Sequence, residues 1–184
     1  MADRADITPE LLRQLFRYDA ETGHLIWLPR PPEMFEGKEK NNCGSWNAKN
    51  AGKIAGTIDA KGYRRTRVNG VSILMHRIVW AIIHGRWPEQ CIDHIDHNKL
   101  NNRIENLRDC SSLQNFRNQR LSKHNTSGVS GVSWSKANQK WHVRIGNGGS
   151  RKYLGHYPSF DEAVAVKRKA ERELGYHTNH GAKL

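Results

Sequence analysis

The sequence predicts an α+β protein, in which short helices and strands alternate before a small C-terminal sheet with one helix. Apolar residues make up only 36% of the 184 residues, so any hydrophobic core is modest and divided among small units. The spacing of the apolar residues changes repeatedly between the two-residue period of a strand and the 3.6-residue period of a helix. The longest uninterrupted apolar run, residues 78–83, is too short to cross a membrane.

The position of these patterns divides the chain into four regions. We expect an N-terminal helix and β extension in residues 1–60, a mixed core in residues 61–122, a linker in residues 123–128, and a domain of three strands and one helix in residues 129–184. The net charge of +12 is uneven, because the first region holds 8 Lys and Arg against 9 Asp and Glu, which leaves 22 against 9 in the remainder. A basic surface of this kind indicates a polyanionic partner.

The N-terminal region begins with a predicted helix. Thr8 is a suitable N-cap, Pro9 is a suitable first helical residue, and apolar residues follow at helical spacing. A turn then leads into a strand at residues 24–28. Residues 29–50 show no periodicity, and we expect a solvated loop there, with ordering upon DNA binding as the alternative.

A hairpin is predicted next. Residues 52–68 alternate as a strand does, and the Asn69-Gly70 pair that follows is a strong signal for a two-residue turn. Arg65 and Arg67 share one face of the strand that precedes this turn. These two arginines either lie on a solvated edge or contact phosphate, and the second alternative is nearly as well supported as the first.

A short helix is expected over residues 76–84, and Gly85 is suited to end it. Its apolar residues lie at helical spacing and predict one buried face. His76 and His84 also lie in this helix. We interpret both as core or cap residues rather than ligands.

The stretch formed by residues 91–118 is too polar for a simple core segment and predicts an active site. It contains four acids, two histidines and six asparagines between apolar residues. Its pattern predicts a strand, a structured loop, a second strand over residues 107–110, and a helix that Ser111 and Ser112 cap and that extends to Arg120. The asparagines of the loop can hydrogen-bond their own backbone.

This layout is expected to bring Asp93 and His94, at the end of the first strand, opposite Asn115 in the helix. The Asp93 carboxylate and the Asn115 carbonyl supply the oxygen ligands that a hard divalent cation prefers, and they leave positions for water and a phosphate. His94 can be neutral near pH 7 and can take a proton from an attacking water. Together these are the parts of a metal-assisted phosphodiesterase.

At these residues the stretch resembles the HNH endonuclease family, whose ββα-metal (His-Me finger) site has this order of elements. The flanking sequences MHRIVWAIIHG and NNRIENLRDCSSLQN resemble the phage and intron-encoded, homing-type branch of that family. The resemblance implies that Asp93 and Asn115 bind one divalent metal, Mg²⁺ with Mn²⁺ as the alternative, and that His94 is the general base. It also implies that Asn106 tethers the loop and orients the base. The third motif position is Asn115 rather than histidine, which occurs in this branch.

Residues 117–128 are basic and polar, and their periodicity is lost after Leu121. This composition indicates the end of a helix that passes into a linker. Arg117, Arg120 and Lys123 are the residues that we expect to follow a DNA backbone there.

The C-terminal region predicts a second small unit. Residues 129–135, 140–145 and 151–155 are strand candidates separated by turns, and a helix capped at Ser159 follows them. Three strands and one helix bury one face of a sheet and leave the other face open. The residues expected on or near the open face, subject to one register step, are Lys140, His142, Arg144, Trp134, Arg151 and Lys152.

The sequences GVSW, KWHVRI and KYLGHYPSFDEAVAVKRKA in this region resemble the DNA-binding domain of plant ethylene-response factors. The resemblance implies that the three-stranded sheet enters the major groove of DNA, as other β-sheet readers do. It places Lys140, Arg144 and Arg151 on the DNA-facing side. Ser133 and Ser135 stand where the plant domains often carry arginines, so the base specificity of those domains is not carried over.

The three cysteines are odd in number, widely spaced and without a CxxC pair. This pattern argues against a disulfide framework and against a cysteine-rich zinc site. We therefore expect a soluble protein of a reducing compartment, the cytoplasm, which would be that of the host cell if a phage encodes the chain.

Motif and charge together predict a site-directed, metal-dependent endonuclease that acts on double-stranded DNA, without a membrane partner. A single catalytic site nicks one strand per event, and we expect a monomer rather than a dimer. One alternative is a DNA-binding regulator built on an HNH fold that no longer cuts. A second is a basic RNA-binding module. The plain alternative is a chance match, since Asp-His pairs and Asn-rich loops are common.

Overall fold

The computed structural model of the protein describes residues 6–35 and 42–182. These residues form two compact units, unit 1 (Met1–Asp109) and unit 2 (Cys110–Leu184), and each unit is described by itself. Part of the loop expected over residues 29–50, namely residues 36–41, lies outside the described residues. No helix in the described part of the chain is long and apolar enough to span a membrane.

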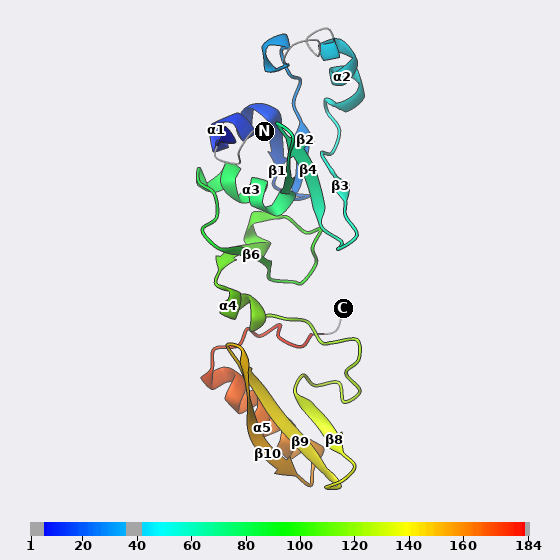
Figure 1. Ribbon diagram of the computed structural model, residues 1–184, viewed down its shortest axis with the longest axis vertical. Helices are drawn as coiled ribbons and strands as arrows, with labels where there is room; N and C mark the ends of the chain where they lie inside the picture. Colours follow the sequence, from blue (N-terminus) through cyan, green and yellow to red (C-terminus); the bar gives the residue numbers. More distant parts are fainter. Residues whose placement is uncertain (1–5, 36–41, 183–184) are drawn as a thin grey trace. The chain divides into compact units, whose positions relative to one another are not determined.

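Unit 1 is built from short elements that follow one another closely along the chain (Figure 1). Its helices are α1 (Pro9–Leu15), α2 (Cys43–Asn50) and α3 (Met75–His84), with 3₁₀ turns η2 (Pro32–Met34) and η4 (Ile104–Asn106). Its strands are β1 (Phe16–Asp19), β2 (His24–Trp27), β3 (Thr57–Ile58), β4 (Arg64–Val68), β5 (Val71–Leu74), β6 (Cys91–His94) and β7 (Leu107–Cys110). β1 pairs with β2, β4 lies between β3 and β5, and β6 pairs with β7.

One hydrophobic core joins the N-terminal part of unit 1 to the rest of it. Its buried residues come from α1, α3 and six of the strands, and they extend along the chain from Ile7 to Leu107. Two hydrogen bonds reinforce this union, because Trp87 Nε1 donates to Ile7 O at 2.9 Å and Arg13 Nη2 donates to Ile82 O at 2.6 Å. The described part of the region expected as an N-terminal extension, residues 6–35 and 42–60, therefore shares one core with the residues that follow it.

Helix α2 corrects the expectation of a solvated loop over residues 29–50. The Arg30 guanidinium lies over the Trp27 ring at 4.6 Å and over the Trp46 ring at 4.1 Å. The Asn47 side chain accepts from Arg30 N at 2.9 Å and donates to Arg30 O at 2.8 Å. Cation–π and aromatic contacts order this segment, and such contacts leave no periodic signal in the sequence.

The strand expected over residues 52–68 is interrupted by a turn, so that β3 and β4 are separate. Asp59 Oδ1 accepts from the backbone N–H of Lys61 at 2.9 Å and of Tyr63 at 3.0 Å. Asp side chains commonly stabilise turns in this way. The strand pattern is therefore correct for β4 and wrong for the residues just before it.

The hairpin turn after β4 is confirmed. Asn69 and Gly70 both have positive φ, 48° and 78°, and Val68 pairs with Val71 across the turn. Two consecutive positive φ angles are the conformation of a type I′ turn, which matches the twist of the flanking strands. Helix α3 likewise ends where the sequence predicts, at Gly85, whose φ is 67°.

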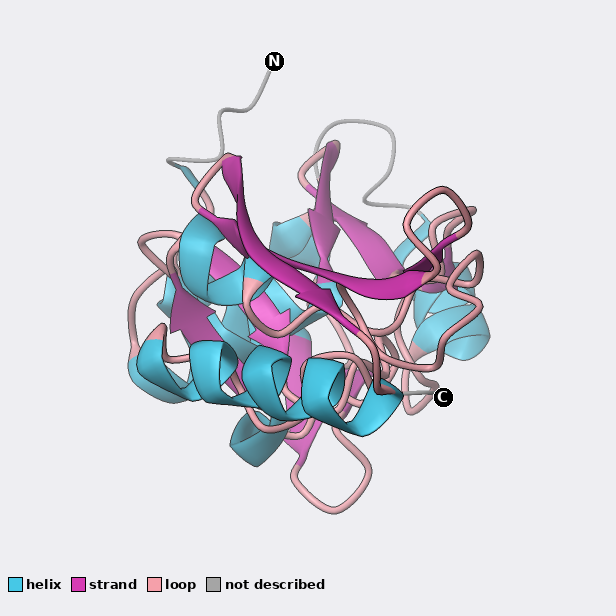
Figure 2. Cartoon of the chain, turned by 90° about the horizontal axis from the view of Figure 1, so that it is seen from below, coloured by secondary structure: helices cyan, strands magenta, loops and turns pink. Residues whose placement is uncertain are grey.

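Unit 2 consists of α4 (Ser112–Phe116), β8 (Val132–Ser135), β9 (Lys140–Asn147), β10 (Ser150–Tyr157) and α5 (Phe160–Glu173). The strands form an antiparallel sheet in the order β10-β9-β8, and α5 packs along one of its faces (Figures 1 and 2). The small core between sheet and helix contains Val132, Val143 and Ala163, with Trp141 and Phe160 packed against them. The other face of the sheet is not covered by α5.

Helix α4 begins where the sequence predicts and ends early. Ser111 Oγ accepts from Gln114 N at 3.2 Å while Gln114 Oε1 accepts from Ser111 N at 2.9 Å, which completes a capping box. The helix then ends at Phe116 instead of continuing to Arg120.

The segment after α4 pairs with the C-terminal segment of unit 2 instead of continuing the helix. Three backbone hydrogen bonds of 3.1, 2.8 and 3.0 Å join the two segments, from His177 N to Arg117 O, from Gly181 N to Gln119 O and from Leu121 N to Ala182 O. Backbone groups that a helix would use internally are thereby committed elsewhere. The region expected as one core, residues 61–122, is accordingly divided between the two units.

Two glycines with similar backbone angles allow a matched stability test. Gly56 (φ +77°) and Gly70 (φ +78°) both lie in the left-handed region, but a Cβ at Gly56 would lie 2.4 Å from Arg65 O, whereas a Cβ at Gly70 meets nothing within 4 Å. We expect Gly70→Ala to lower the free energy of unfolding by about 1–2 kcal/mol and Gly56→Ala by about 3 kcal/mol or more. Urea denaturation of the purified variants measures both. Equal losses would contradict the close approach of β4 to Gly56.

Candidate active site

The polar residues at the end of β6 and at the start of β7 are buried in unit 1. Asp93 is 8% exposed, His94 5% and Asn106 7%. Asp93 and His94 are the last two residues of β6, and Asn106 ends η4 directly before β7. Because buried polar groups need partners, each of these side chains is held by specific neighbours.

His94 is oriented by a buried asparagine. Its Nε2 lies 3.0 Å from Asn102 Oδ1, and Asn102 is only 4% exposed. With the Asn102 amide oriented in this way its oxygen only accepts, so His94 Nε2 carries the proton and Nδ1 carries the lone pair. Burial lowers the pKa of His94, while the Asn102 hydrogen bond and the negative charge of Asp96 oppose that shift. The ring is therefore a neutral base at pH 7.

Two further aromatic rings surround His94. The His76 ring lies edge-on to it with the centroids 5.0 Å apart, and the Tyr63 ring centroid lies 6.1 Å away. Burial, reinforced by the neighbouring positive charges of His94 and Arg77, lowers the pKa of His76 to about 3. His76 is indeed a core residue, as expected, but the core it belongs to is the wall of the candidate site. No local sequence pattern indicates this contact, because α3 and β6 meet only in the folded chain.

Asn106 closes the loop between the two strands. Its Nδ2 donates to Asp96 Oδ1 at 2.9 Å and to Asn101 O at 2.8 Å, and its Oδ1 accepts from Asp96 N at 2.9 Å. Asn101 Nδ2 adds a bond to Asp96 Oδ2 at 2.7 Å. These hydrogen bonds lower the pKa of Asp96 against the opposing effect of its partial burial, so that it is a carboxylate at neutral pH.

Asp93 forms an ion pair that the sequence analysis missed. Arg108 Nη2 and Nε donate to Asp93 Oδ2 at 2.7 and 3.0 Å, and the side chains are 28% and 9% exposed. A buried carboxylate is costly unless it is paired, so Arg108 stabilises the charge of Asp93. The available signal was the basic residue on β7, the strand that pairs with β6.

The fourth predicted site residue lies in the other unit. Asn115 is part of α4, in unit 2, whereas Asp93 and His94 belong to unit 1. In the described ranges, 6–35 and 42–182, no three His, Cys, Asp or Glu residues lie together as a metal site would require. A ligand pair of one aspartate and one asparagine contains a single residue of those types, so this finding does not test it.

The basic residues proposed to contact DNA are spread over both units. In unit 1, Arg65 Nη1 lies 4.0 Å from Asp59 Oδ2, and Arg67 is exposed on the same strand. In unit 2, Arg117 donates to Asn147 Oδ1 at 3.4 Å, and its guanidinium carbon lies 5.8 Å from the Tyr176 ring centroid. Arg120 and Lys123 are exposed.

The register of the sheet in unit 2 decides which of its basic residues share a face. Directly paired residues of antiparallel strands point to the same side. Tyr153 pairs with Arg144, and Arg151 pairs with Gly146, so these side chains belong to the uncovered face together with Lys140. Lys152 pairs with the buried Ile145 and therefore belongs to the opposite face. Trp134 also belongs to that opposite face, since it pairs with Trp141, the neighbour of the buried core.

The uncovered face carries an aromatic cluster that the sequence analysis did not anticipate. The rings of His142 and Tyr153 are stacked with centroids 5.2 Å apart, and His156 lies 5.0 Å from His142. The Tyr153 hydroxyl and His156 Nδ1 are 2.6 Å apart. Burial, with the charge of Arg144 and then that of His156, lowers the pKa of His142. Pairing across β9 and β10, which local sequence does not report, assembles the cluster.

Comparisons with known proteins agree with the motif. The model of the HNH endonuclease family matches residues 74–117, which include Asp93, His94, Asn106 and Asn115. Protein 3.8 of Escherichia phage T7 is 37% identical over 102 residues, which are 54% of this chain and 82% of that protein. An uncharacterized HNH endonuclease of Acanthamoeba polyphaga mimivirus is 31% identical over 102 residues, 54% of this chain and 52% of that protein. No solved structure matches the chain significantly.

The buried His76 makes the stability of unit 1 sensitive to acid. Because its pKa is lowered to about 3 from 6.5, the folded state binds fewer protons than the unfolded state between these pH values. The free energy of unfolding should therefore fall by about 1.4 kcal/mol per pH unit on account of His76 as the pH drops below 6.5. Between pH 7 and pH 5, we expect the free energy of unfolding of His76→Gln to fall by about 2 kcal/mol less than that of the parent protein.

Urea denaturation at the two pH values provides the measurement. His84→Gln, which changes an exposed histidine at the end of the same helix, serves as the control and should keep the pH dependence of the parent. An unchanged pH dependence in His76→Gln would show that His76 is not buried in its neutral form.

Proposed function

This chain belongs to the HNH endonuclease family, and we propose that it is a site-directed, metal-dependent enzyme that hydrolyses phosphodiester bonds in double-stranded DNA. The observation that supports this most is the state of His94, a buried and neutral imidazole whose Nε2 proton is held by Asn102. A general base needs a neutral side chain and a fixed orientation. Burial favours the neutral form of His94, and the hydrogen bond with Asn102 fixes its orientation.

In the proposed mechanism His94 Nδ1 takes the proton of the attacking water. The imidazolium that results is stabilised by Asn102 Oδ1 on its other nitrogen and by the negative charge of Asp96. Asn106 acts as a positioning residue, because its three hydrogen bonds hold the loop that carries Asp96 and Asn101. Hydrogen bonds of such a supporting residue keep a catalytic side chain in its productive geometry.

HNH endonucleases generally use a divalent metal ion, and Asp93 and Asn115 would hold it in this chain. Both offer oxygen ligands, which suit Mg²⁺, our first choice, and Mn²⁺ as the alternative. When bound, the ion supplies positive charge beside the scissile phosphate and the departing oxygen. Arg108 orients the Asp93 carboxylate, and a carboxylate has enough lone pairs to bind an arginine and a cation together.

Unit 2 is proposed to hold the DNA. HNH nucleases act on DNA, and the uncovered face of the β8–β10 sheet presents Lys140, Arg144 and Arg151 beside the exposed Tyr153. The family match ends at residue 117, so this part of the proposal rests on the sheet and on its resemblance to the ethylene-response-factor domain. Phosphate contacts of basic side chains position a protein on a duplex.

Further basic residues extend the proposed DNA surface beyond the sheet. These are Arg65 and Arg67 in unit 1, and Arg117, Arg120 and Lys123 in unit 2. One catalytic site per chain implies that a monomer nicks a single strand per event, as expected for a homing-type enzyme of phage or intron origin.

The rival function is a DNA-binding regulator built on the same fold without catalysis. The Arg108–Asp93 ion pair is the feature that favours it, because a metal ion must share the carboxylate with the guanidinium. The two functions differ in one outcome, namely cleavage.

Cleavage of supercoiled plasmid by the purified protein tests the catalytic proposal. With Mg²⁺ we expect open-circular product, and with EDTA none. Loss of the general base in His94→Ala should slow the reaction by about 10²–10⁴-fold. Asp93→Ala and Asn115→Ala should each require a higher Mg²⁺ concentration for the same rate.

His84→Ala, at an exposed histidine outside the site, is the control and should cut as the parent does. Cleavage by His94→Ala at the parental rate would refute the assignment, and binding without cleavage in Mg²⁺ or Mn²⁺ would favour the regulator.

Lysines on opposite faces of one sheet test the DNA-binding proposal. Lys140 lies on the uncovered face and Lys152 on the other, and both are exposed. If the uncovered face lies against DNA, Lys140→Gln should weaken duplex binding and reduce the slope of log affinity against log salt by about 0.9. Lys152→Gln should change that slope little. Fluorescence anisotropy with a labelled duplex in EDTA, over a salt series, gives both values; a larger effect of Lys152→Gln would reverse the proposed face.

A further inference from the structure

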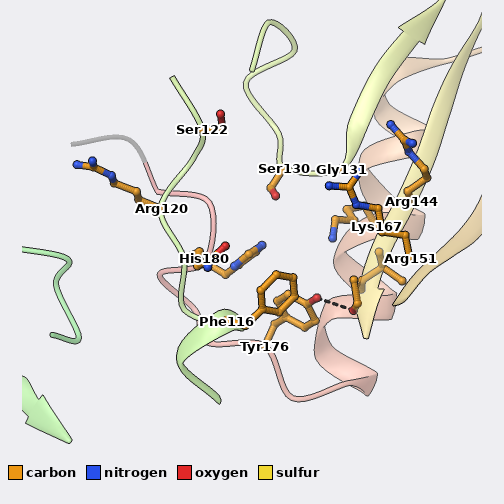
Figure 3. A pocket seen from close by; sticks show the side chains of 13 residues that line it. Phe116, Arg120, Ser122, Ser130, Gly131, Arg144, Arg151, Lys167, Tyr176 and His180 are labelled. Atoms are coloured by element: carbon orange, nitrogen blue, oxygen red, sulfur yellow. Dashed lines mark hydrogen bonds between the residues drawn. The ribbon is translucent and has the colours of Figure 1, made fainter. Parts of the chain in front are cut away.

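Unit 2 contains a pocket of about 340 Å³ that is lined by residues of this unit alone (Figure 3). Its walls come from β9 and β10, from α5, and from the two paired segments around residues 116–122 and 176–180. The volume falls in the range of sites for small molecules or for one unit of a polymer.

The lining is basic. Arg120, Arg144, Arg151 and Lys167 all contribute to it, and no Asp or Glu of the described chain does. In the same described residues, Arg120, Arg144 and Arg151 form no ion pair. Positive charges gathered around one cavity repel one another, and an anion bound between them relieves that repulsion.

Lys167 is the buried member of this set. It is only 2% exposed, yet it lines the pocket, and its Nζ lies 3.2 Å from Glu171 Oε1. Glu171 is shared, because Arg168 Nη1 lies 3.0 Å from its Oε2 and His180 Nε2 lies 3.9 Å from its Oε1. One carboxylate thus faces three basic groups. The positive charge at this end of the pocket is only partly balanced within the protein.

The pocket also has aromatic walls, and one of them lies beside Lys167, whose Nζ is 5.2 Å from the Tyr176 ring centroid. Phe116 and Tyr176 form these walls, and the Tyr176 hydroxyl is fixed by donating to Gly146 O at 2.7 Å. A Cβ at Gly146 would lie 2.6 Å from Phe116 Cζ, so the absence of a side chain there lets the ring lie against β9. Phe116 remains 37% exposed. An aromatic ring beside a cationic wall is the combination that binds a base together with its phosphate.

We propose that this pocket binds a single nucleotide, with its phosphate between Arg151 and Lys167 and its base against Phe116. The nucleotide is either free or an unpaired unit of a DNA strand, since both present the same chemistry. The pocket lies wholly in unit 2, and nucleotide binding there does not require the nuclease activity proposed for unit 1. A catalytically inactive protein would bind the nucleotide equally well.

Isothermal titration calorimetry with the full chain in EDTA tests the pocket directly. The probes are thymidine 5′-monophosphate, thymidine, inorganic phosphate, a short oligothymidylate and a duplex of equal length. We expect thymidine 5′-monophosphate or the oligothymidylate to bind, and thymidine not to bind. Arg151→Gln, which removes an exposed charge and leaves the core intact, should weaken that binding about tenfold. Phe116→Leu should weaken the binding of the nucleotides but not the binding of inorganic phosphate.

Arg172→Gln is the matched control, because Arg172 is an exposed arginine of the same unit that does not line the pocket. Binding of the monophosphate identifies a free nucleotide as the ligand, and binding of the oligothymidylate alone identifies a unit of a strand. The proposal fails if neither binds, if Arg151→Gln and Arg172→Gln have equal effects, or if only the duplex binds. Cleavage of plasmid by the parental protein with Mg²⁺ tests the proposed nuclease function on its own, and so separates failure of the pocket from failure of the nuclease.

Discussion

The burial of polar side chains between β6 and β7 is the constraint on which the candidate site depends. Asp93, His94 and Asn106 are each less than a tenth exposed, and a buried polar group without a partner costs about 1–3 kcal/mol. Each therefore has a dedicated partner, which is Arg108 for the carboxylate, Asn102 for the imidazole and Asp96 for the Asn106 amide. The same contacts that satisfy these groups also orient them, so stability and orientation come from one set of hydrogen bonds.

The small cores of the two units explain why so many other interactions are polar. Unit 1 supplements its core with the Arg30 cation–π contacts and with side-chain hydrogen bonds at turns. Among the described residues of unit 2, the core cluster contains three buried apolar residues, and the unit gains further order from the backbone hydrogen bonds between its first and last segments. The two segments that these bonds join also form walls of the pocket, because the segment after α4 is held there instead of continuing as a helix.

The charge of the chain has two uses under these proposals. The uncovered sheet face offers Lys140 and Arg144 beside an aromatic cluster, which suits the backbone of a nucleic acid. The pocket collects Arg151 and the buried Lys167 around a cavity of about 340 Å³, which suits one nucleotide. A net charge of +12 is consistent with both uses and distinguishes neither, since composition carries no positions.

The sequence by itself determined the elements whose signals are local. The Thr8 cap, the Asn69-Gly70 turn, the end of α3 at Gly85 and the capping box at Ser111 are confirmed, because each depends on residues within one turn of the chain. It also identified the family through Asp93, His94, Asn106 and Asn115, whose spacing is a property of the chain alone.

Only the tertiary structure decided the partners of those residues. Asn102 on His94, Arg108 on Asp93 and the His76 ring beside His94 arise where separate segments meet, and no periodicity reports such a meeting. Helix α2 and the early end of α4 follow from contacts with distant residues in the same way. The physical reason is that local patterns specify backbone conformation and burial, whereas the identity of a buried neighbour depends on how the elements pack.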